Sequence, residues 1–195
     1  FSCRVTNLVS MGQGEPFQNY QATLEALRFA NTKDGLEIGA RHITVSTCGI
    51  IQGIERLANE PEQFTLAVSL HSALQDVRNE IMPRCSNIPL PHLKKALRSY
   101  IEKTGRRVSF EYLLIKGVTD TEENLAALID FCDGLLCHIN LLSVNEVEGS
   151  PYKPSSTATQ QRWVKELKSA GKEATIRNSR GSDIDGACGQ LKNKM

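Results

Sequence analysis

Short apolar runs of strand length alternate with amphipathic stretches along this chain of 195 residues. Six runs rich in apolar and β-branched residues are expected to be buried strands, at positions 5–12, 41–49, 64–71, 106–115, 137–145 and 173–179. Five stretches whose apolar residues recur near every 3.6 positions are expected helices, at 19–31, 50–59, 90–105, 121–135 and 158–171. Such alternation predicts βαβ units, a parallel sheet and the α/β class.

Polar residues near the ends of the expected strands favour a barrel over a doubly wound sheet. They are Gly14, Glu15, Ser46, Ser69, His71, Glu111 and Asn145. In a (β/α) barrel the carboxyl ends of the strands converge on one mouth, where active sites are built. Because about eight units complete such a barrel, we expect either a partial (β/α) barrel or a whole one whose front is missing.

Composition and charge exclude several classes of protein. Hydrophobic residues make up 40% and charged residues 23% of the chain, which is typical of globular proteins. No apolar run reaches the roughly 18 residues of a membrane span and no leader-like segment opens the chain, so we expect a cytoplasmic protein with no membrane partner. The net charge of +1 excludes a strongly basic nucleic-acid module, although local basic patches stay open. Because Phe1 stands where an initiator methionine is expected, we also expect an N-terminal truncation.

The six cysteines are spread widely along the chain. The closest pair, Cys132 and Cys137, lacks the CxxC spacing of zinc ribbons, so we predict no metal ligands and reduced thiols. Cys188 differs from the others because "RGSDIDGACGQL" (180–191) surrounds it with small residues. Burial as a small hydrophobe is therefore less expected, and both a reactive and an inert thiol stay open.

The segment "MGQGEP" (11–16) follows the first expected strand. Its glycines would let a ligand approach the backbone, and Glu15 supplies a carboxylate that can accept hydrogen bonds from an amine. It is not a GxGxxG fingerprint, because Phe17 stands where the third glycine belongs, and it is not a P-loop. A purely structural turn with a solvated Glu15 is the competing interpretation.

The other polar residues at strand ends also have two interpretations. His71 either contacts a ligand or is an ordinary hydrogen-bonded histidine. Ser46 and Ser69 either bind a ligand or terminate their strands for turn reasons. Glu111 alternates with apolar residues, and a carboxylate that points inward would need a partner such as an arginine. Asn145 either presents its amide to a nucleoside or caps the next turn.

Six segments, taken in this order, resemble the radical-SAM adenine-C2 methyltransferases. These enzymes act on 23S ribosomal RNA and on transfer RNA, and a related branch methylates adenine C8. The segments are "MGQGEP", "HITVSTCGI", "AVSLHSALQDVRNEIMP", "FEYLLIKGVTDTEEN", "INLLSVNEVEGSPY" and "RNSRGSDIDGACGQL", which extend from about residue 5 to residue 191. The resemblance implies that residues 1–195 are the C-terminal portion of a radical-SAM catalytic domain, which is a partial (β/α) barrel and here lacks its first βα unit.

The resemblance also implies a mechanism. In this family the cysteine of ACGQL, here Cys188, takes a methyl group from one S-adenosylmethionine and becomes S-methylcysteine. A second S-adenosylmethionine, cleaved at a [4Fe-4S] cluster, yields a radical that removes hydrogen from this methyl group. The resulting carbon radical adds to adenine C2, and a second cysteine resolves the protein–RNA crosslink. The implied partners are 23S rRNA and tRNA, with the target base flipped out of its stack; we predict no stable protein partner.

The family's contacts to S-adenosylmethionine fall on matched positions of this chain. The resemblance implies that these are Gly14, Glu15, Ser46, Ser69, Leu70, His71 and Asn145. Glu15 is expected to accept hydrogen bonds from the amino group of the methionine moiety.

The chain departs from the family's pattern at the cluster. The family holds its [4Fe-4S] cluster with a CxxxCxxC loop, whose three thiolates leave one iron open. No such spacing occurs among the six cysteines of this chain. In the family this loop, the resolving cysteine and an RNA-contacting domain all precede the GEP strand. We therefore expect the cluster ligands to be absent from this chain, and the chain alone to be inactive.

Two other interpretations stay open. A cluster-free relative that binds RNA or a protein partner would keep the fold, although such a scaffold does not need the ACGQL segment. An unrelated barrel enzyme with Cys188 as nucleophile would need a histidine base, and His71 is the candidate at the expected mouth. The sequence also leaves open the choice between ribosomal and transfer RNA, and between adenine C2 and C8.

Overall fold

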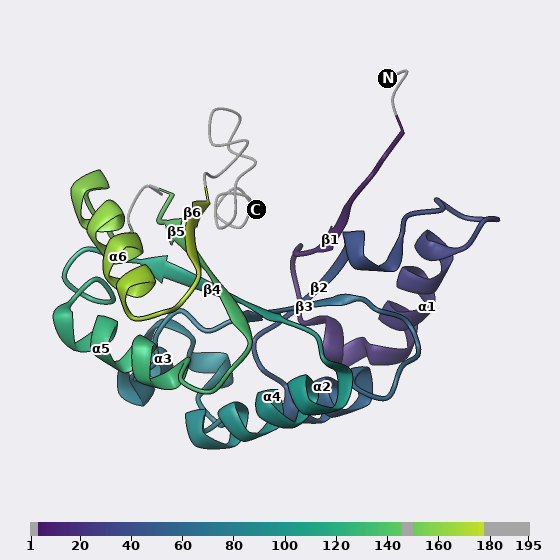
Figure 1. Cartoon of the computed structure of the whole chain (residues 1–195), viewed down its shortest axis with the longest axis horizontal. Coiled ribbons are helices and arrows are strands. Elements are labelled where there is room, and N and C mark those ends of the chain that lie inside the picture. The colour runs from purple at the N-terminus through teal and green to yellow at the C-terminus, as the bar shows by residue number, and fades with distance from the viewer. Residues whose placement is uncertain (1–3, 146–149, 178–195) are drawn as a thin grey trace. The chain divides into compact units, whose positions relative to one another are not determined.

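A computed structural model describes residues 4–145 and 150–177 of the chain (Figure 1). Its strands are β1 (Leu8–Ser10), β2 (Ile43–Thr47), β3 (Thr65–Ser69), β4 (Val108–Leu114), β5 (Cys137–Ser143) and β6 (Ala174–Arg177). Each strand lies inside one of the runs expected from the sequence. The strand order is β1-β2-β3-β4-β5-β6, the order of the chain. For the described residues this order has β1 and β6 at its two ends, so the sheet is open and not a closed barrel.

Helices follow the strands, as the alternating pattern predicts. The α-helices of the described chain are α1 (Tyr20–Asn31), α2 (Ile51–Leu57), α3 (Gln75–Ile81), α4 (Leu90–Thr104), α5 (Glu122–Phe131) and α6 (Thr157–Ser169). Short 3₁₀ helices occur at η1 (Pro16–Asn19), η2 (Ala40–His42) and η3 (Pro83–Cys85). The five expected helices and the α/β class are confirmed.

Helix α3 was not expected from the sequence. It has only 7 residues, and Val77 and Ile81 are its only apolar side chains. Two apolar residues are too few to show a helical period. Its N-cap residue is Leu74, whose apolar side chain cannot cap a helix, so no N-cap signal in the sequence marks where α3 begins.

Local residue types explain where α5 begins and where α4 and α6 end. The hydroxyl of Thr121 accepts a hydrogen bond from the Asn124 amide and so caps α5. Gly105, directly after α4, has a φ of 63°, and Gly171, just beyond α6, has a φ of 73°. Glycine adopts this left-handed conformation without the steric cost that a Cβ adds, which explains where both helices end.

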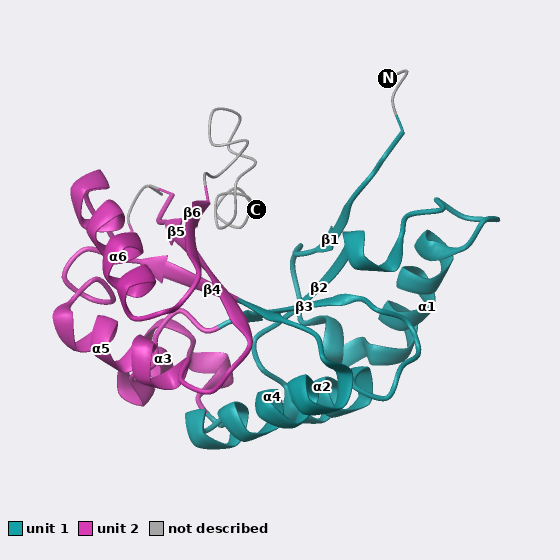
Figure 2. Cartoon of the chain, viewed as in Figure 1, with its two compact units in different colours: residues 1–69, 87–109 teal, residues 70–86, 110–195 magenta. Residues whose placement is uncertain are grey.

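The chain divides into two compact units, unit 1 (residues 1–69 and 87–109) and unit 2 (residues 70–86 and 110–195) (Figure 2). In unit 1, β1, β2 and β3 run parallel. Alternate residues of β2 are buried, and Ile43 and Val45 are completely inaccessible to solvent. Helices α2 and α4 contact each other in the same unit.

In unit 2, aromatic side chains show which face of β4 is covered by helices. The ring of Phe110 lies 5.7 Å from that of Phe131 in α5, and the ring of Tyr112 lies 5.3 Å from that of Trp163 in α6. Successive side chains of a strand point to opposite faces. Glu111, between these two aromatic residues, therefore points away from α5 and α6. Strands β5 and β6 of this unit are parallel.

Within residues 4–145 and 150–177, the chain contains no helix that is both long and apolar enough to cross a membrane.

Candidate functional site

Glu15 connects the glycine-rich turn to the end of strand β2 in unit 1. Its Oε1 accepts a hydrogen bond from the Phe17 amide at 3.0 Å, and its Oε2 accepts one from the Cys48 amide at 2.7 Å. The interpretation of Glu15 as a solvated loop acid is therefore wrong. Each carboxylate oxygen has a second lone pair, so Glu15 can still accept hydrogen bonds from an amine.

The backbone around Glu15 is open to an approaching ligand. Gly14 has a φ of 101°, a conformation that residues with a Cβ rarely adopt. A Cβ built on Gly12 or Gly14 would have no heavy atom within 4 Å. The turn thus requires Gly14 for its conformation, and the open space at both glycines leaves their backbone exposed.

Ser46 and Ser69 present hydroxyl groups at the carboxyl ends of β2 and β3. Both residues are half-buried, and in the described chain neither hydroxyl has a hydrogen-bond partner. Ser46 pairs in register with Ala67 of β3, so Ser69 lies slightly nearer the carboxyl edge. Two uncommitted hydroxyls at this edge are suited to hydrogen-bonding a polar ligand.

In unit 2 the "SLH" segment forms a tight turn around His71. The amides of Leu70 and His71 both donate to the carbonyl oxygen of Glu111, at 3.1 and 3.2 Å. The Ser72 amide donates to the carbonyl oxygen of Leu70 at 2.7 Å, which closes a γ-turn. His71 has a φ of 57°, a value that is uncommon for any residue with a side chain. Strained residues of this kind are concentrated at functional sites.

The imidazole of His71 is held neutral. Burial lowers the pKa of His71 to about 4, and the positive charge of Arg78 acts in the same direction. The Nδ1 atom of His71 is buried and has no hydrogen-bond partner among the described residues. A buried polar atom without a partner is costly, and a bound ligand could satisfy it.

A buried hydrogen-bond network holds this turn in place. The Ser72 hydroxyl donates to Oδ1 of Asn124 at 2.8 Å, and the Tyr112 hydroxyl donates to the same atom at 3.2 Å. Nδ2 of Asn124 donates to the carbonyl oxygen of Val118 and to the hydroxyl of Thr121. Burial raises the pKa of Tyr112, so its hydroxyl stays protonated and keeps donating. This network could not be predicted from the sequence, because Ser72 and Asn124 are 52 residues apart.

The structure says less about the other residues predicted to form the site. Leu70 has a fully buried side chain, so only its main chain is available to a ligand. Asn145 is half-buried and lies just beyond the end of β5. Cys188 lies outside the described residues. Gly14, Glu15, Ser46 and Ser69 belong to unit 1, whereas Leu70, His71 and Asn145 belong to unit 2.

Each unit offers polar groups of the kind that S-adenosylmethionine could bind, whereas the described residues provide no ligand set for a metal cluster. Glu15 offers acceptors for an amino group, the two serines offer hydroxyls, and His71 offers a buried ring nitrogen without a partner. In contrast, the described residues contain no group of three or more His, Cys, Asp or Glu side chains that could hold a metal ion. The described cysteines Cys48, Cys85, Cys132 and Cys137 are free thiols, and two of them are buried.

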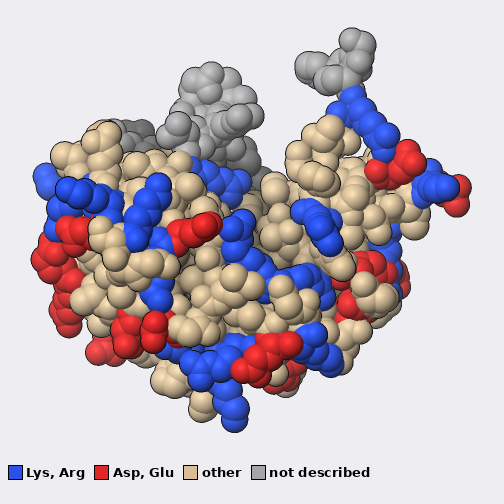
Figure 3. Space-filling view, in the orientation of Figure 1, with Lys and Arg blue, Asp and Glu red and all other residues tan. Residues whose placement is uncertain are grey.

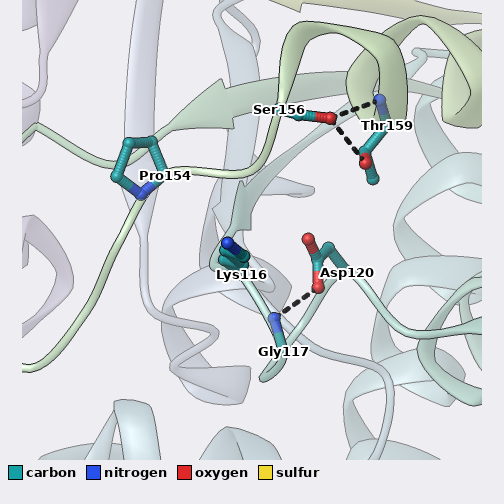
Figure 4. Close-up of a pocket in the computed structure, with 6 residues that line it drawn as sticks. All are labelled: Lys116, Gly117, Asp120, Pro154, Ser156 and Thr159. Carbon is teal, nitrogen blue, oxygen red and sulfur yellow. Dashed lines mark hydrogen bonds between the residues drawn. The ribbon is translucent and has the colours of Figure 1, made fainter.

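A pocket in unit 2 is lined by none of the predicted residues (Figure 4). It is lined by Lys116, Gly117, Asp120, Pro154, Ser156 and Thr159. Its polar groups already serve local structure. Asp120 accepts hydrogen bonds from the Gly117 amide and the Ser155 hydroxyl, and Ser156 caps α6. We therefore assign no ligand to this pocket.

Charges of both signs occur on the face of the molecule shown in Figure 3. Among the described residues several charges are paired: Arg28 contacts Glu60 and Glu62 at 2.8 and 2.7 Å, and Lys172 contacts Asp133 at 3.1 Å. This mixture agrees with the net charge of +1.

Comparison with curated proteins shows close relatives over nearly the whole chain. The chain is 46% identical over 189 residues to a probable dual-specificity RNA methyltransferase RlmN from Clostridium novyi. The alignment covers 97% of this chain and 55% of that relative. The chain thus spans about half the length of the curated relatives it matches. No protein-family model matches the chain.

Comparison with solved structures supports the same relationship. A radical SAM methyltransferase from Sphaerobacter thermophilus superimposes with a TM-score of 0.92 and 46% identity, over 95% of this chain and 55% of that structure. A domain of a pyruvate-formate lyase-activating enzyme from Bacteroides vulgatus gives a TM-score of 0.68 at 19% identity. The second similarity shows the shared fold alone.

Proposed function

Because this chain belongs to the family of the dual-specificity RNA methyltransferases RlmN, a radical-SAM family, we propose that it is the C-terminal part of the catalytic domain of such an enzyme. Residues 1–195 would then carry the methyl-accepting cysteine and much of the cofactor pocket. The similarity over nearly the whole chain is the observation that carries this proposal. The strained, hydrogen-bonded SLH turn and the uncommitted polar groups at the strand ends support it.

The proposed cofactor is S-adenosylmethionine, which supplies an electrophilic methyl group on a positively charged sulfur. Glu15, already held by the Phe17 and Cys48 amides, would bind the amino group with its remaining lone pairs. Ser46 and Ser69 would donate or accept hydrogen bonds through their hydroxyls, and Asn145 through its amide. Gly14 would allow close approach, and Leu70 would contribute its main chain.

His71 would contribute a neutral imidazole to the binding of the cofactor. Because its pKa is lowered to about 4, it carries no charge at neutral pH. It would therefore not repel a positively charged sulfonium, and its buried Nδ1 would gain a hydrogen-bond partner. Glu111 and Asn124 hold the γ-turn through hydrogen bonds, and the turn would fix the backbone position from which the imidazole ring extends.

Cys188 is the proposed methyl acceptor. Its thiolate would attack the methyl carbon; the bond from that carbon to the cofactor's sulfur would break, with its electron pair departing on that sulfur. The thiol proton would be lost beforehand, because the thiolate is the nucleophilic form. Small neighbours on both sides, Ala187 and Gly189, leave steric room for a cofactor and then for a base.

The proposed substrate is RNA, as the relatives' name indicates. The resemblance narrows this to adenine C2 in 23S rRNA and tRNA, reached after the base leaves its stack. A cytoplasmic location follows from such substrates. The [4Fe-4S] cluster of the full enzyme would be bound by residues outside this sequence, since its cysteines lack the CxxxCxxC spacing.

The decisive test compares two cysteine variants in a protein of the relatives' full length that carries this sequence. We expect Cys188→Ala to abolish methylation of adenine in RNA and to remove the methyl group that mass spectrometry detects on the parent's Cys188 peptide. Cys48→Ala is the matched control and should keep most of the activity. Loss of activity in Cys48→Ala but not in Cys188→Ala would overturn the assignment.

A further inference from the structure

Glu111 is a carboxylate at a central position of β4, and the function proposed above does not use it. Only 6% of its side chain is exposed. Its neighbours Phe110 and Tyr112 face helices α5 and α6, so Glu111 points to the opposite face of the strand. A buried carboxylate is retained in a fold only when charged or hydrogen-bonding partners compensate its desolvation.

The main chain of Glu111 is joined to the SLH turn. Its carbonyl oxygen accepts both the Leu70 and the His71 amides, at 3.1 and 3.2 Å. One carbonyl thus uses both of its lone pairs on this turn. Any displacement of β4 at Glu111 would move the start of the turn that carries His71.

The side chain of Glu111 is joined to β5 and β6. Oε1 accepts a hydrogen bond from Nδ2 of Asn140 at 2.8 Å, and Oε2 forms an ion pair with Arg177 at 3.3 Å. Oδ1 of Asn140 in turn accepts from the hydroxyl of Thr175, its register partner in β6. The polar face of these three strands is therefore linked through Glu111.

Arg177 connects this network to the end of strand β6. It is the last residue of β6 and pairs in register with Leu142. Cys188 follows β6 in the sequence. Strand β6 has only 4 residues and pairs at one end of the strand order, so few backbone hydrogen bonds hold its last residue. An ion pair to a buried carboxylate strengthens that attachment.

We propose that Glu111 is a positioning residue, which fixes the end of β6 with respect to the SLH turn. This inference rests on the proposed function, in which the SLH turn contacts the cofactor and Cys188 accepts the methyl group. Glu111 touches neither of these groups directly. It sets the point from which the chain continues towards Cys188, while its carbonyl oxygen sets the position of His71.

The expected effect follows from the geometry of group transfer. A nucleophile must approach to about 3–3.5 Å from the reacting atom, and a misplacement of about 1 Å can slow a reaction by about 100-fold. Loosening the end of β6 would leave the point from which the chain continues towards Cys188 less well defined. The rate of methyl transfer to Cys188 should therefore fall, whereas the binding of S-adenosylmethionine should change little.

The test uses Glu111→Gln and Arg177→Gln, separately and together, in a protein of the relatives' full length with its cofactors. We expect methylation of Cys188, followed by peptide mass in a single turnover, to slow by at least about 10-fold in each variant. The double variant should be no slower than either single one, because both remove the same pair. The dissociation constant for S-adenosylmethionine should stay within about threefold of the parent's.

A second readout does not depend on activity. Amide hydrogen exchange of Ile176 and Arg177 should accelerate by about 10-fold or more in both variants, because the strand end opens locally. Arg177→Lys keeps the positive charge, so its rate of Cys188 methylation should be at least half of the parent's rate. The Arg177 side chain is 44% exposed, so its substitution leaves no buried cavity. The Arg177 variants therefore still test the inference if Glu111→Gln folds poorly.

The matched control is an ion pair of the same unit. Arg162 of α6 pairs with Glu122 of α5, and 72% of the Glu122 side chain is exposed. Glu122→Gln and Arg162→Gln should leave the methylation of Cys188 and the β6 exchange within about twofold of the parent's, because exposed ion pairs contribute little.

Two results would overturn the inference. One is unchanged β6 exchange and unchanged Cys188 methylation in Glu111→Gln. The other is a loss of affinity for S-adenosylmethionine that equals the loss of rate, which would make Glu111 part of the cofactor site. A parent protein whose Cys188 never carries a methyl group would instead refute the proposed function, and the β6 exchange would still decide whether Glu111 anchors this strand.

Discussion

His71 combines a positive φ, a buried ring nitrogen and a turn whose amides are all engaged. The positive φ and the buried ring nitrogen each cost free energy in the folded state. The γ-turn is held by Glu111 and by the Ser72–Asn124 hydrogen bond, whereas the Nδ1 atom has no compensation among the described residues. A residue kept in such a state points to a function rather than to folding.

The lowered pKa of His71 predicts a stability that depends on pH. The unfolded state binds a proton near pH 6.5, and the folded state binds it only near pH 4. The unfolded state therefore holds more protons between these values, so the contribution of His71 to stability is complete above about pH 6.5 and decreases as the pH falls. We expect a loss of about 2 kcal/mol between pH 7 and pH 5 from this residue.

Urea unfolding at both pH values tests this expectation, with His71→Asn as the comparison. Asparagine tolerates a positive φ and does not titrate. The free energy of unfolding of the variant should be less sensitive to pH by about the same 2 kcal/mol. Identical pH dependence of parent and variant would show that His71 does not titrate as its burial implies.

At the scale of elements, a glycine inside helix α2 allows close packing of the residues that follow the glycine-rich turn (residues 11–16). A Cβ on Gly53 would lie 2.3 Å from the ring of Phe17, which belongs to η1. Phe17 is 7% exposed, and its amide donates to Glu15. The helix thus has a glycine where the 3₁₀ helix after the turn packs closely against it.

Gly53→Ala is expected to destabilise the protein, although alanine favours a helix by about 1 kcal/mol over glycine. The methyl group would displace the Phe17 ring, and overpacking of this kind costs about 1–3 kcal/mol. Thermal or urea unfolding measures the net effect. Gln52→Ala, at an exposed position of the same helix, is the control and should change stability by less than about 0.5 kcal/mol. A stabilised Gly53→Ala would refute the close packing.

At the scale of the whole molecule, the chain spans about half the length of its curated relatives. None of its cysteines has the CxxxCxxC spacing that a radical-SAM cluster requires. The proposed methyl acceptor, Cys188, is among these 195 residues, and we propose that the residues that generate the radical are not.

We therefore expect the 195-residue chain alone to transfer no methyl group to RNA. The measurement is the incorporation of labelled methyl from S-adenosylmethionine into adenine, with a protein of the relatives' full length as the positive control. Methylation by the short chain in a preparation without iron would contradict the proposed mechanism. A result at background for both proteins would instead question the RNA substrate.

Much of this molecule can be predicted from the sequence because local periodicity and turn chemistry act over short distances. The six strands and five of the helices follow directly from residue patterns. Helix α3 does not, because seven mostly polar residues carry no period. The need of Glu111 for an arginine was also predictable, since a buried carboxylate requires a partner.

The tertiary structure decided which residues meet. It paired Glu111 with Arg177, 66 positions away, and Ser72 with Asn124, 52 positions away. It also gave Glu15 a structural role through the Cys48 amide, and His71 its positive φ and lowered pKa. Burial and long-range hydrogen bonds depend on how elements pack, and no local pattern encodes them. The sequence alone thus determined the fold class and the positions of candidate residues, and packing determined the chemical state of those that the structure describes.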